Sequence, residues 1–563
     1  MQFLLTAIIL FCTLLATGCG GGSDSGQSSP PVVVPSPEPR QTPTSGPVFS
    51  PVSIEGDITI SGHITFDLVP HNAFGGLEYT KAAPEAVRGV TVQLMDATDS
   101  VIRQSKTDND GFYSIGAPPN TQARVVVLAE YYSDAGPQWD FAVVDNTEGD
   151  SLYLLADTLA LTTRLNETRD IHAESGWNRV LGEFDDEAHR PAAPFAVLHA
   201  VYQVVSAIAA ADDSFVLPAC TLNWSYRNKA SAGDVTEGYV GTSYYDVFSN
   251  RIYILGDAYN DTDEYDFSVI QHELGHFFED GLSRSDSIGG SHGLSSKLDM
   301  RVAFSEGFSN ALTALVSGEP NYMDSAGTGL FDSFRFNLED NLYGNAGWYN
   351  ENSIGKVLYD LADSHNESGD ALSLGFSAIY DVMTADGFIH SDALGSIFLF
   401  SEIFREQQPT AVTNEFKSLL ASEAIYGTDR FGLDESNDGG DVSVLPIYSS
   451  MVQGETIEAC SSNRFSEANG LGVNRFIRLS ITNPGSVQFR IERVNGGSEV
   501  SNPNARLYKN RRFIAQMISS VNDLEVGVAL LSTGEHVLEI FDKYNADEDS
   551  SLRNTTCFNV SVI

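Results

Sequence analysis

The chain has 563 residues, of which 32 are Lys or Arg and 76 are Asp or Glu, giving a formal net charge of −44. This length exceeds one ordinary core, and a hydrophobic content of 42% is enough to build several folded units. Because the acidic residues are spread along the whole chain, the surface would repel nucleic acid and anionic lipid. We therefore expect neither of these as a partner.

Residues 1–18 have the composition of a signal peptide. Residues 3–17 are almost wholly apolar, which is long enough for a signal but short for a membrane span. The segment ends in Leu15-Ala16-Thr17-Gly18-Cys19, which resembles the lipobox of bacterial lipoproteins, although no Lys or Arg precedes it and Ala16 replaces the usual Leu. The resemblance implies that Cys19 is lipidated and that the protein is exported to the cell envelope and anchored in the outer membrane. A plain secretory signal is the alternative.

Two segments of contrasting composition follow. Residues 19–50 are rich in Ser, Pro and Gly, which predicts a disordered tether. Residues 51–165 contain short β-branched runs, and the turn at 108–111 is a hairpin signal. This pattern resembles the transthyretin-like, carboxypeptidase-regulatory-type β-sandwich of exported bacterial proteins. The turn has few carboxylates, so we expect a hairpin rather than a calcium site there.

Residues 166–445 are predicted to form a helix-rich unit, and residues 446–563 return to β alternation and predict a C-terminal β-sandwich. A β segment is expected at 249–261. Helices are expected at 195–211, 264–281 (with Gly281 near the C-cap), 299–318, 352–363, 370–384, 392–405 and 411–425. The first of these helices is apolar, but His199 and Gln203 indicate a packed helix rather than a membrane span.

The five cysteines have separate roles in this interpretation. Cys12 belongs to the signal, and Cys220 has no nearby cysteine or basic residue, which favours a buried structural thiol. Cys460 and Cys557 bracket the last unit, and export favours a disulfide between them. The sequence has no CxxC motif, so no thiolate zinc site is expected.

The segment His272-Glu273-Leu274-Gly275-His276 is the clearest chemical motif. On an α-helix, His272 and His276 share one face and can direct ring nitrogens at one ion, with Glu273 beside them. Because such a pattern also arises by chance, a third ligand is needed. The alternative is a surface helix with a coincidental histidine pair.

Two of three known templates for the third ligand fail. The metzincin template requires Gly at 279 and His or Asp at 282, where this chain has Glu279 and Leu282, and no inverted HxxEH motif occurs. The predicted helix 299–318 supplies Glu306, with Asn310 one turn later. These two lie on a different strip from the apolar positions Val302, Phe304, Phe308, Leu312 and Leu315.

The HELGH motif followed by "AFSEGFSNAL" resembles the gluzincin branch of zinc metallopeptidases, as in thermolysin-like and bacterial collagenase-type enzymes, over roughly 195–430. Residues 283–307 are similar to exported lipoproteins of this kind. The resemblance implies an α+β gluzincin-like core, with a small sheet and a mainly α-helical subdomain, flanked by N- and C-terminal β-sandwiches. It further implies that His272, His276 and Glu306 bind Zn²⁺ and that Glu273 is the general base. Asn310 stands where thermolysin-like enzymes brace a zinc histidine with an acidic residue, so it is a candidate neutral support.

We therefore expect a membrane-anchored zinc endopeptidase that hydrolyses protein or peptide substrates by zinc-activated water. The oxyanion-stabilising residue is open, with His292, Tyr349 and Tyr359 as candidates. The strand near 251–257 is either an edge that pairs with a substrate peptide or an interior strand. Residues 256–266 either hold Ca²⁺ or form a solvated loop that caps the next helix. A catalytically inactive surface binding or adhesion lipoprotein on a metallopeptidase-like scaffold is the alternative function.

Overall fold

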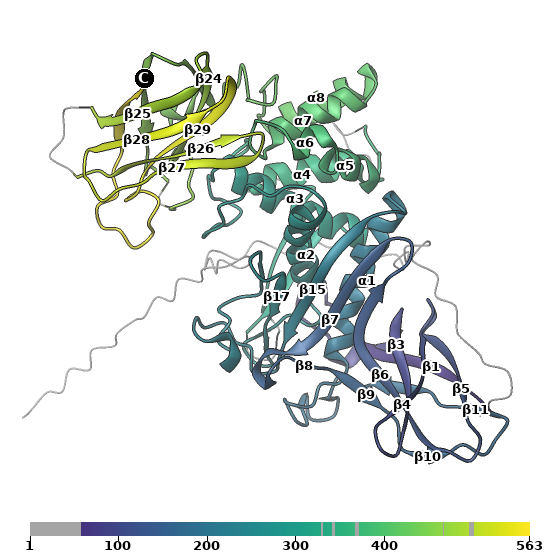
Figure 1. The fold of residues 1–563 in the computed structure, drawn as a ribbon. Helices are drawn as coiled ribbons and strands as arrows, with labels where there is room; N and C mark the ends of the chain where they lie inside the picture. Colours follow the sequence, from purple (N-terminus) through teal and green to yellow (C-terminus); the bar gives the residue numbers. More distant parts are fainter. Residues whose placement is uncertain are drawn as a thin grey trace, which may run out of the picture.

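The computed structural model describes residues 58–563 apart from 328, 329, 331, 341–343, 366–370, 466 and 495–499. The predicted signal peptide and tether, with Cys12 and Cys19, lie outside the described residues. The described chain is multidomain and contains more strand than helix. In Figure 1 the N-terminal sheets, the helices and a C-terminal pair of sheets occupy successive parts of the molecule.

A ten-stranded sheet connects the N-terminal part of the chain to the helical part. Its main path runs β16-β17-β15-β7-β6-β3-β4, with β8, β9 and β10 attached beside it. In chain order its strands are β3 (Val90–Asp96), β4 (Val101–Lys106), β6 (Gln122–Ser133), β7 (Gln138–Asp145), β8 (Ser151–Leu152), β9 (Leu154–Ala156), β10 (Ala160–Leu161), β15 (Val216–Trp224), β16 (Tyr244–Asp246) and β17 (Arg251–Ile254).

The ten-stranded sheet contains strands from both sides of the domain boundary expected at 165/166. Strand β7 pairs in parallel with β15, so the sheet continues directly into the unit expected to begin at residue 166. On the other side, β1 (Ile58–Leu68) pairs with β11 (Asn166–Thr168) and β12 (Ile171–Ala173), and also with β2 (Ala83–Ala86) and β5 (Phe112–Ala117). Residues 58–165 therefore do not close a sandwich of their own, because their strands take partners from later in the chain.

Helix α1 (Ala193–Ala211) covers β6 and β7 and joins the sheet to the other helices. Within the described part of the chain it is the one helix long and apolar enough to cross a membrane. However, 83% of its apolar 18-residue stretch is buried inside the protein. One apolar core extends from Ile60 of β1 through this helix to Phe416 in the last helix. The sheet and the helices thus share a core.

Apart from the short α6, which was not expected, the remaining helices follow the expected order. They are α2 (Phe267–Leu282), α3 (Met300–Ser317), α4 (Glu351–Ala362), α5 (Phe376–Met383), α6 (Asp386–Ile389), α7 (Ile397–Gln407) and α8 (Thr410–Ser422). Gly281 is inside α2 rather than at its C-cap, which is Ser283. A side chain at Gly281 would place its Cβ 2.9 Å from Pro218 Cδ, so glycine here permits close packing of α2 on β15. Helix α3 lies between α2 and α4 and is buried on nearly every side.

The C-terminal part is a sandwich of two sheets, seen in yellow and green in Figure 1. One sheet contains β22 (Tyr448–Val452), β24 (Asn474–Ile481), β29 (Gly534–Asp542), β26 (Pro503–Lys509) and β27 (Arg512–Met517). The other contains β23 (Thr456–Ser461), β30 (Thr556–Val562), β25 (Gly485–Arg493) and β28 (Leu524–Leu531). Between the sheets lies a separate apolar core that includes Ile477, Phe489 and Val560.

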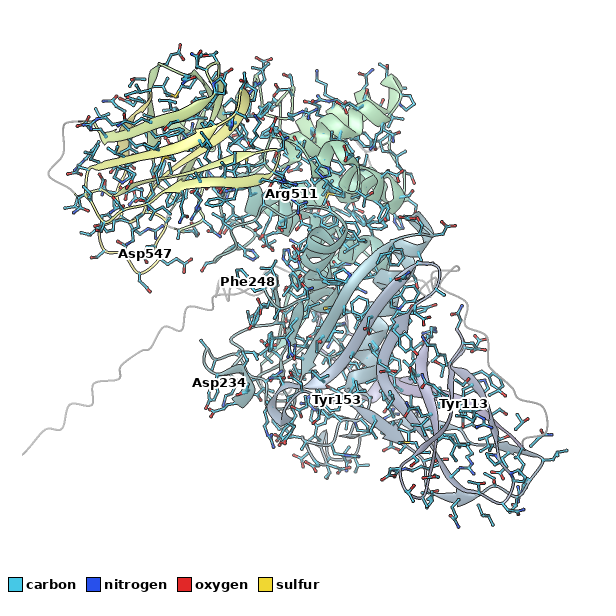
Figure 2. The ribbon with its side chains drawn as sticks, viewed as in Figure 1. Tyr113, Tyr153, Asp234, Phe248, Arg511 and Asp547 are labelled. Carbon is cyan, nitrogen blue, oxygen red and sulfur yellow. A yellow bond between two sulfur atoms is a disulfide. The ribbon has the colours of Figure 1, made fainter. Side chains whose placement is uncertain are left out.

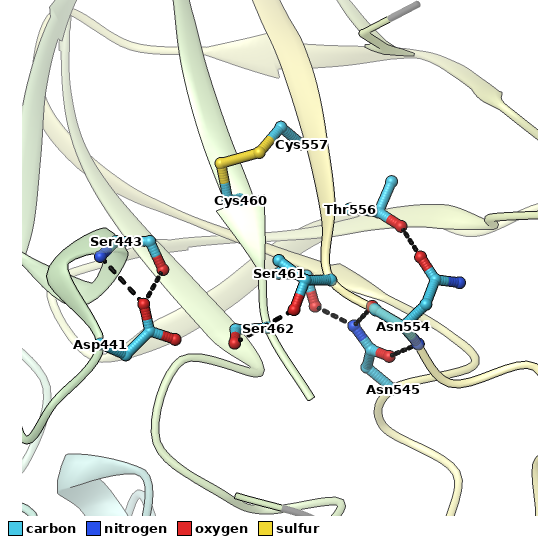
Figure 3. The surroundings of a disulfide bond; sticks show 10 residues. Asp441, Ser443, Cys460, Ser461, Ser462, Asn545, Asn554, Thr556 and Cys557 are labelled. Carbon is cyan, nitrogen blue, oxygen red and sulfur yellow. Dashed lines mark hydrogen bonds between the residues drawn. A yellow bond between two sulfur atoms is a disulfide. The ribbon is translucent and has the colours of Figure 1, made fainter. Parts of the chain in front are cut away.

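A disulfide joins two strands of this sandwich, and a buried ion pair connects the sandwich to helix α3. Cys460 of β23 and Cys557 of β30 are joined by a disulfide, as Figure 3 shows. At the start of α3, Arg301 Nη2 donates to Glu539 Oε1 of β29 at 2.8 Å. The helix that carries Glu306 is therefore bonded directly to the C-terminal sandwich.

Candidate metal centre

Helices α2 and α3 approach each other closely because of a glycine in the HELGH segment. A Cβ added at Gly275 would lie 2.6 Å from Ser309 Oγ and 2.9 Å from Ser309 Cα. Real side chains do not tolerate such distances, so a larger residue at 275 would separate the helices. The close approach brings the histidines of α2 within reach of Glu306 on α3.

Three donor atoms converge between the two helices. Glu306 Oε2 lies 3.0 Å from His272 Nε2 and 3.3 Å from His276 Nε2. The two Nε2 atoms are 3.2 Å apart. His272 and Glu306 are each 3% exposed, so the cluster is shielded from water on most sides.

These donors suit a zinc ion. Two imidazole nitrogens and one carboxylate oxygen are the ligand set of many catalytic zinc sites, and tetrahedral bonds of about 2.0–2.1 Å place ligand atoms about 3.3–3.4 Å apart. The three separations here, 3.0, 3.2 and 3.3 Å, are close to that spacing. The side chains of His272, His276 and Glu306 could thus hold zinc with little movement.

Asn310 orients the first histidine. Its Oδ1 lies 2.9 Å from His272 Nδ1, so the amide oxygen can accept the Nδ1–H and leave the Nε2 lone pair facing Glu306. The structure therefore places Asn310, the support candidate from the sequence, against His272. The contact is neutral, without the charge of a carboxylate partner.

His276 is oriented by a second set of residues that the sequence reasoning missed. Its Nδ1 lies 3.1 Å from Ser305 Oγ, and Ser305 Oγ donates to Glu279 Oε2. Burial raises the pKa of Glu279, while His276 and Ser305 act in the opposite direction. The i,i+3 spacing of His276 and Glu279 was a signal for this contact, since such residues are neighbours on a helix.

The charge on Glu306 is stabilised by the surrounding imidazoles. Burial acts to raise its pKa, but His292, His276 and His272 together hold the pKa of this carboxyl well below its usual range. A low carboxyl pKa favours the ionised form, which is the form that binds a metal.

The carboxylate of Glu273 is directed at the ten-stranded sheet. It is 1% exposed, and its Oε2 accepts a hydrogen bond of 2.8 Å from the backbone N–H of Tyr245 in β16. This bond fixes the carboxylate of α2 against the edge of the sheet.

His292 extends the cluster on another side. Its Nε2 lies 3.5 Å from Glu306 Oε2, and its Nδ1 lies 2.8 Å from Glu351 Oε2 at the start of α4. Of the three oxyanion candidates, His292 is in contact with the cluster. The Tyr349 hydroxyl instead donates to Ala346 O and Asn437 Oδ1, and Tyr359 lies buried in α4. Glu351 had no signal in the sequence, because an acidic residue in a first helical turn is ordinary.

The edge of the sheet beside the cluster is β16. Strand β17 is paired on both sides, with β15 and β16, so the edge role suggested for residues 251–257 does not apply to it. β16 pairs with β17 on one side, and the main path of the sheet ends with it. In the turn after β16, the ring of Phe248 is 97% exposed and is labelled in Figure 2.

Neither the family models nor the curated proteins compared with this chain give a match. Among solved structures, the pre-peptidase C-terminal domain of a Bacillus anthracis collagenase is 9% identical, with 21% of this chain and 94% of that chain covered and a TM-score of 0.16. The g-type lysozyme inhibitor PliG of Aeromonas hydrophila is 11% identical, covering 21% and 97%, with a TM-score of 0.13. The secreted serine protease VesC of Vibrio cholerae is 15% identical, covering 20% and 19%, with a TM-score of 0.11. These are weak likenesses to parts of this chain.

Proposed function

We propose that this protein is a zinc-dependent endopeptidase. The observation that carries the proposal is the convergence of His272 Nε2, His276 Nε2 and Glu306 Oε2 within 3.0–3.3 Å of one another, with Glu273 next to His272 in the chain. The gluzincin-like arrangement expected from the motif is part of this proposal. So is export with a lipid anchor at Cys19, which lies outside the described residues.

The residues divide the chemistry among them. A zinc ion bound by His272, His276 and Glu306 would act as a Lewis acid and lower the pKa of a bound water towards about 7. Glu273 would take the proton from the attacking water and pass it to the leaving amine. Asn310 would hold His272 in the tautomer that presents Nε2 to the ion.

His292 is the best candidate for stabilising charge on the substrate carbonyl oxygen. Its ring is held by Glu351 on the Nδ1 side, so Nε2 remains directed at the centre. A donor fixed in advance at this place stabilises a developing negative charge without reorganisation. Nε2 donates such a bond in the doubly protonated ring, for which Glu351 supplies the neighbouring negative charge.

An extended peptide is the substrate that the sheet edge suits. Strand β16 ends the main path of the sheet, and the backbone of its Tyr245 already bonds to Glu273. A substrate strand added alongside β16 would pass the carboxylate of Glu273. The exposed ring of Phe248 would then contact the substrate or its leaving segment.

The test compares three Glu→Gln variants of the purified protein for bound zinc and for hydrolysis of casein or gelatin. Glu273→Gln should retain zinc and lose activity, whereas Glu306→Gln should lose both. Glu415→Gln, on the exposed side of α8, is the matched control and should change neither. Absence of zinc from the wild type, or full activity in Glu273→Gln, would instead favour an inactive surface binding or adhesion protein.

A further inference from the structure

A group of three carboxylates lies outside the candidate zinc site of His272, His276 and Glu306. It comprises Asp261 in β19 (Asp261–Thr262), Asp263 just after this strand, and Asp324 in β20 (Asn321–Ala326). One carboxylate oxygen from each lies within 4.8 Å of the others. Strand β19 pairs with β20, so the backbone itself holds the two segments together.

Within this group Asp263 is buried, and Asp261 and Asp324 are half-buried. Asp263 is 2% exposed, its Oδ2 accepts a bond from Ser243 Oγ, and its Oδ1 is inaccessible. The facing Asp261 carboxyl can donate to Asp263 only when it is protonated, so two ionised carboxylates would leave Oδ1 without a donor. Asp261 Oδ1 is likewise inaccessible to water and without a hydrogen-bond donor when the neighbouring carboxylates are ionised. Within the described part of the chain, no Lys, Arg or His forms an ion pair with Asp261, Asp263 or Asp324. Buried charges without such partners are rare in proteins.

The alternative expected from the sequence, a solvated loop that caps α2, does not describe this segment. Asp266 is the residue before α2, but its side chain makes no bond to the helix N–H groups. Its Oδ2 instead accepts from Ser325 N at 3.0 Å and Ser325 Oγ at 2.7 Å, and its Oδ1 lies 2.5 Å from His71 Nε2. Asp263 and Asp266 are both buried rather than solvated.

We propose that Asp261, Asp263 and Asp324 form a second metal site, which binds Ca²⁺ through carboxylate oxygens. The donor set contains only oxygen, which suits a hard cation and not zinc. Burial, together with repulsion from the neighbouring aspartates, raises the pKa of all three carboxyl groups. A divalent cation would remove that repulsion and occupy the unpartnered oxygens.

The location of this site gives it a structural role. Asp261 and Asp263 lie directly before α2, which carries His272 and His276, and β20 follows α3, which carries Glu306. In β20, the ring of Tyr322 packs edge-on against His272, with centroids 6.1 Å apart. Calcium at this site would therefore connect the segment just before α2 to β20, which follows α3. The proposal does not depend on peptidase activity.

The test is calorimetric titration of CaCl₂, and separately MgCl₂, into the zinc-saturated full chain. The wild type should bind Ca²⁺ saturably, and Asp263→Asn and Asp324→Asn should each weaken binding by at least about tenfold, since ligand charge sets calcium affinity. Asp257→Asn is the matched control, because it removes an aspartate of the same segment outside the group and should bind as the wild type does. Hydrogen exchange should slow on adding Ca²⁺ in peptides covering 256–270 and 320–326.

Three results would overturn the proposal: no Ca²⁺ binding by the wild type, undiminished binding by both Asn variants, or binding of Mg²⁺ alone. Thermal unfolding in a calcium-free buffer gives a further check that does not rely on affinity. There Asp263→Asn should unfold at a temperature equal to or above that of the wild type, because it removes a buried like charge. A lower temperature in calcium-free buffer would mean that Asp263 acts only as a hydrogen-bond acceptor, and would also contradict the proposal.

Discussion

His292 and Glu351 form a buried pair in which Nδ1 of the ring lies 2.8 Å from Oε2 of the carboxylate. The two residues come from different segments, a loop after α2 and the first turn of α4. The carboxylate thus holds the ring from behind while the opposite nitrogen faces Glu306.

From this pair we predict that His292→Gln lowers kcat/KM by about 10²–10³-fold, the usual effect of removing one donor to a developing oxyanion. Bound zinc should remain, because His272, His276 and Glu306 are unaltered. Glu351→Gln should have a smaller effect on kcat/KM, since the amide oxygen can still accept a hydrogen bond from Nδ1 while the negative charge beside the ring is lost. Tyr349→Phe is the control, as its hydroxyl bonds elsewhere. Loss of zinc in His292→Gln would mean that His292 is a ligand instead.

Asn310 should control zinc affinity rather than the reaction step. Asn310→Ala removes the acceptor for His272 Nδ1 and should weaken zinc binding by about 10–100-fold, as other supporting residues do. Asn310→Asp should strengthen binding, because a charged acceptor makes the imidazole a better donor. Competition with a chromogenic chelator measures both. Equal affinity in all three proteins would exclude the supporting role.

Gly275 should be required for the packing of α2 on α3. Gly275→Ala places a methyl group against Ser309 and should lower the free energy of unfolding by about 1–3 kcal/mol, with weaker zinc binding as the helices separate. Gly395→Ala is the comparison, since its Cβ would meet Asp286 at an ordinary contact distance of 3.4 Å. Denaturant unfolding of the two variants measures the difference. A Gly275→Ala protein as stable as Gly395→Ala would show that the helices are not limited by this contact.

The disulfide should stabilise the C-terminal sandwich and leave the metal centre unchanged. It closes a loop with a sequence separation of 97, and removal of a native disulfide costs about 2–5 kcal/mol. We expect the double variant Cys460→Ser, Cys557→Ser to unfold at a lower temperature, with normal zinc content. A reducing agent should lower the unfolding temperature of the wild type but have no further effect on the variant. An effect of equal size on both would point to a different cause.

Helices could be predicted where apolar residues recur at regular helical spacing in the sequence. Helices α1, α2 and α3 begin and end within a few residues of their expected positions, because apolar spacing and cap residues are local signals. Helix α5 begins at Phe376, later than the residue 370 expected. The short α6 was missed, as a single turn has too few residues to show a period.

Long-range pairing was not predictable in the same way. Nothing in residues 138–145 indicates that β7 will pair with β15, about eighty residues later, so the sequence alone does not predict a sheet that continues past residue 165. The same reason explains which residues of the candidate metal centre were predicted. Sequence spacing identified His272, His276 and Glu306. The contacts of the other residues depend on how helices and strands pack, and these residues are Ser305, Glu279, Glu351 and Tyr245. The assignment of zinc ligands stays a prediction until metal is measured.

The parallel pairing of β7 with β15 also limits how this protein can be shortened. A chain begun at residue 166 would leave one whole side of β15 without a hydrogen-bonding neighbour, and α1 would lose the strands that it covers. Exposed strand edges invite pairing between molecules, so such a fragment should aggregate. The N-terminal strands are therefore part of the same folded unit as α1 and β15, and they cannot be removed as a separate domain.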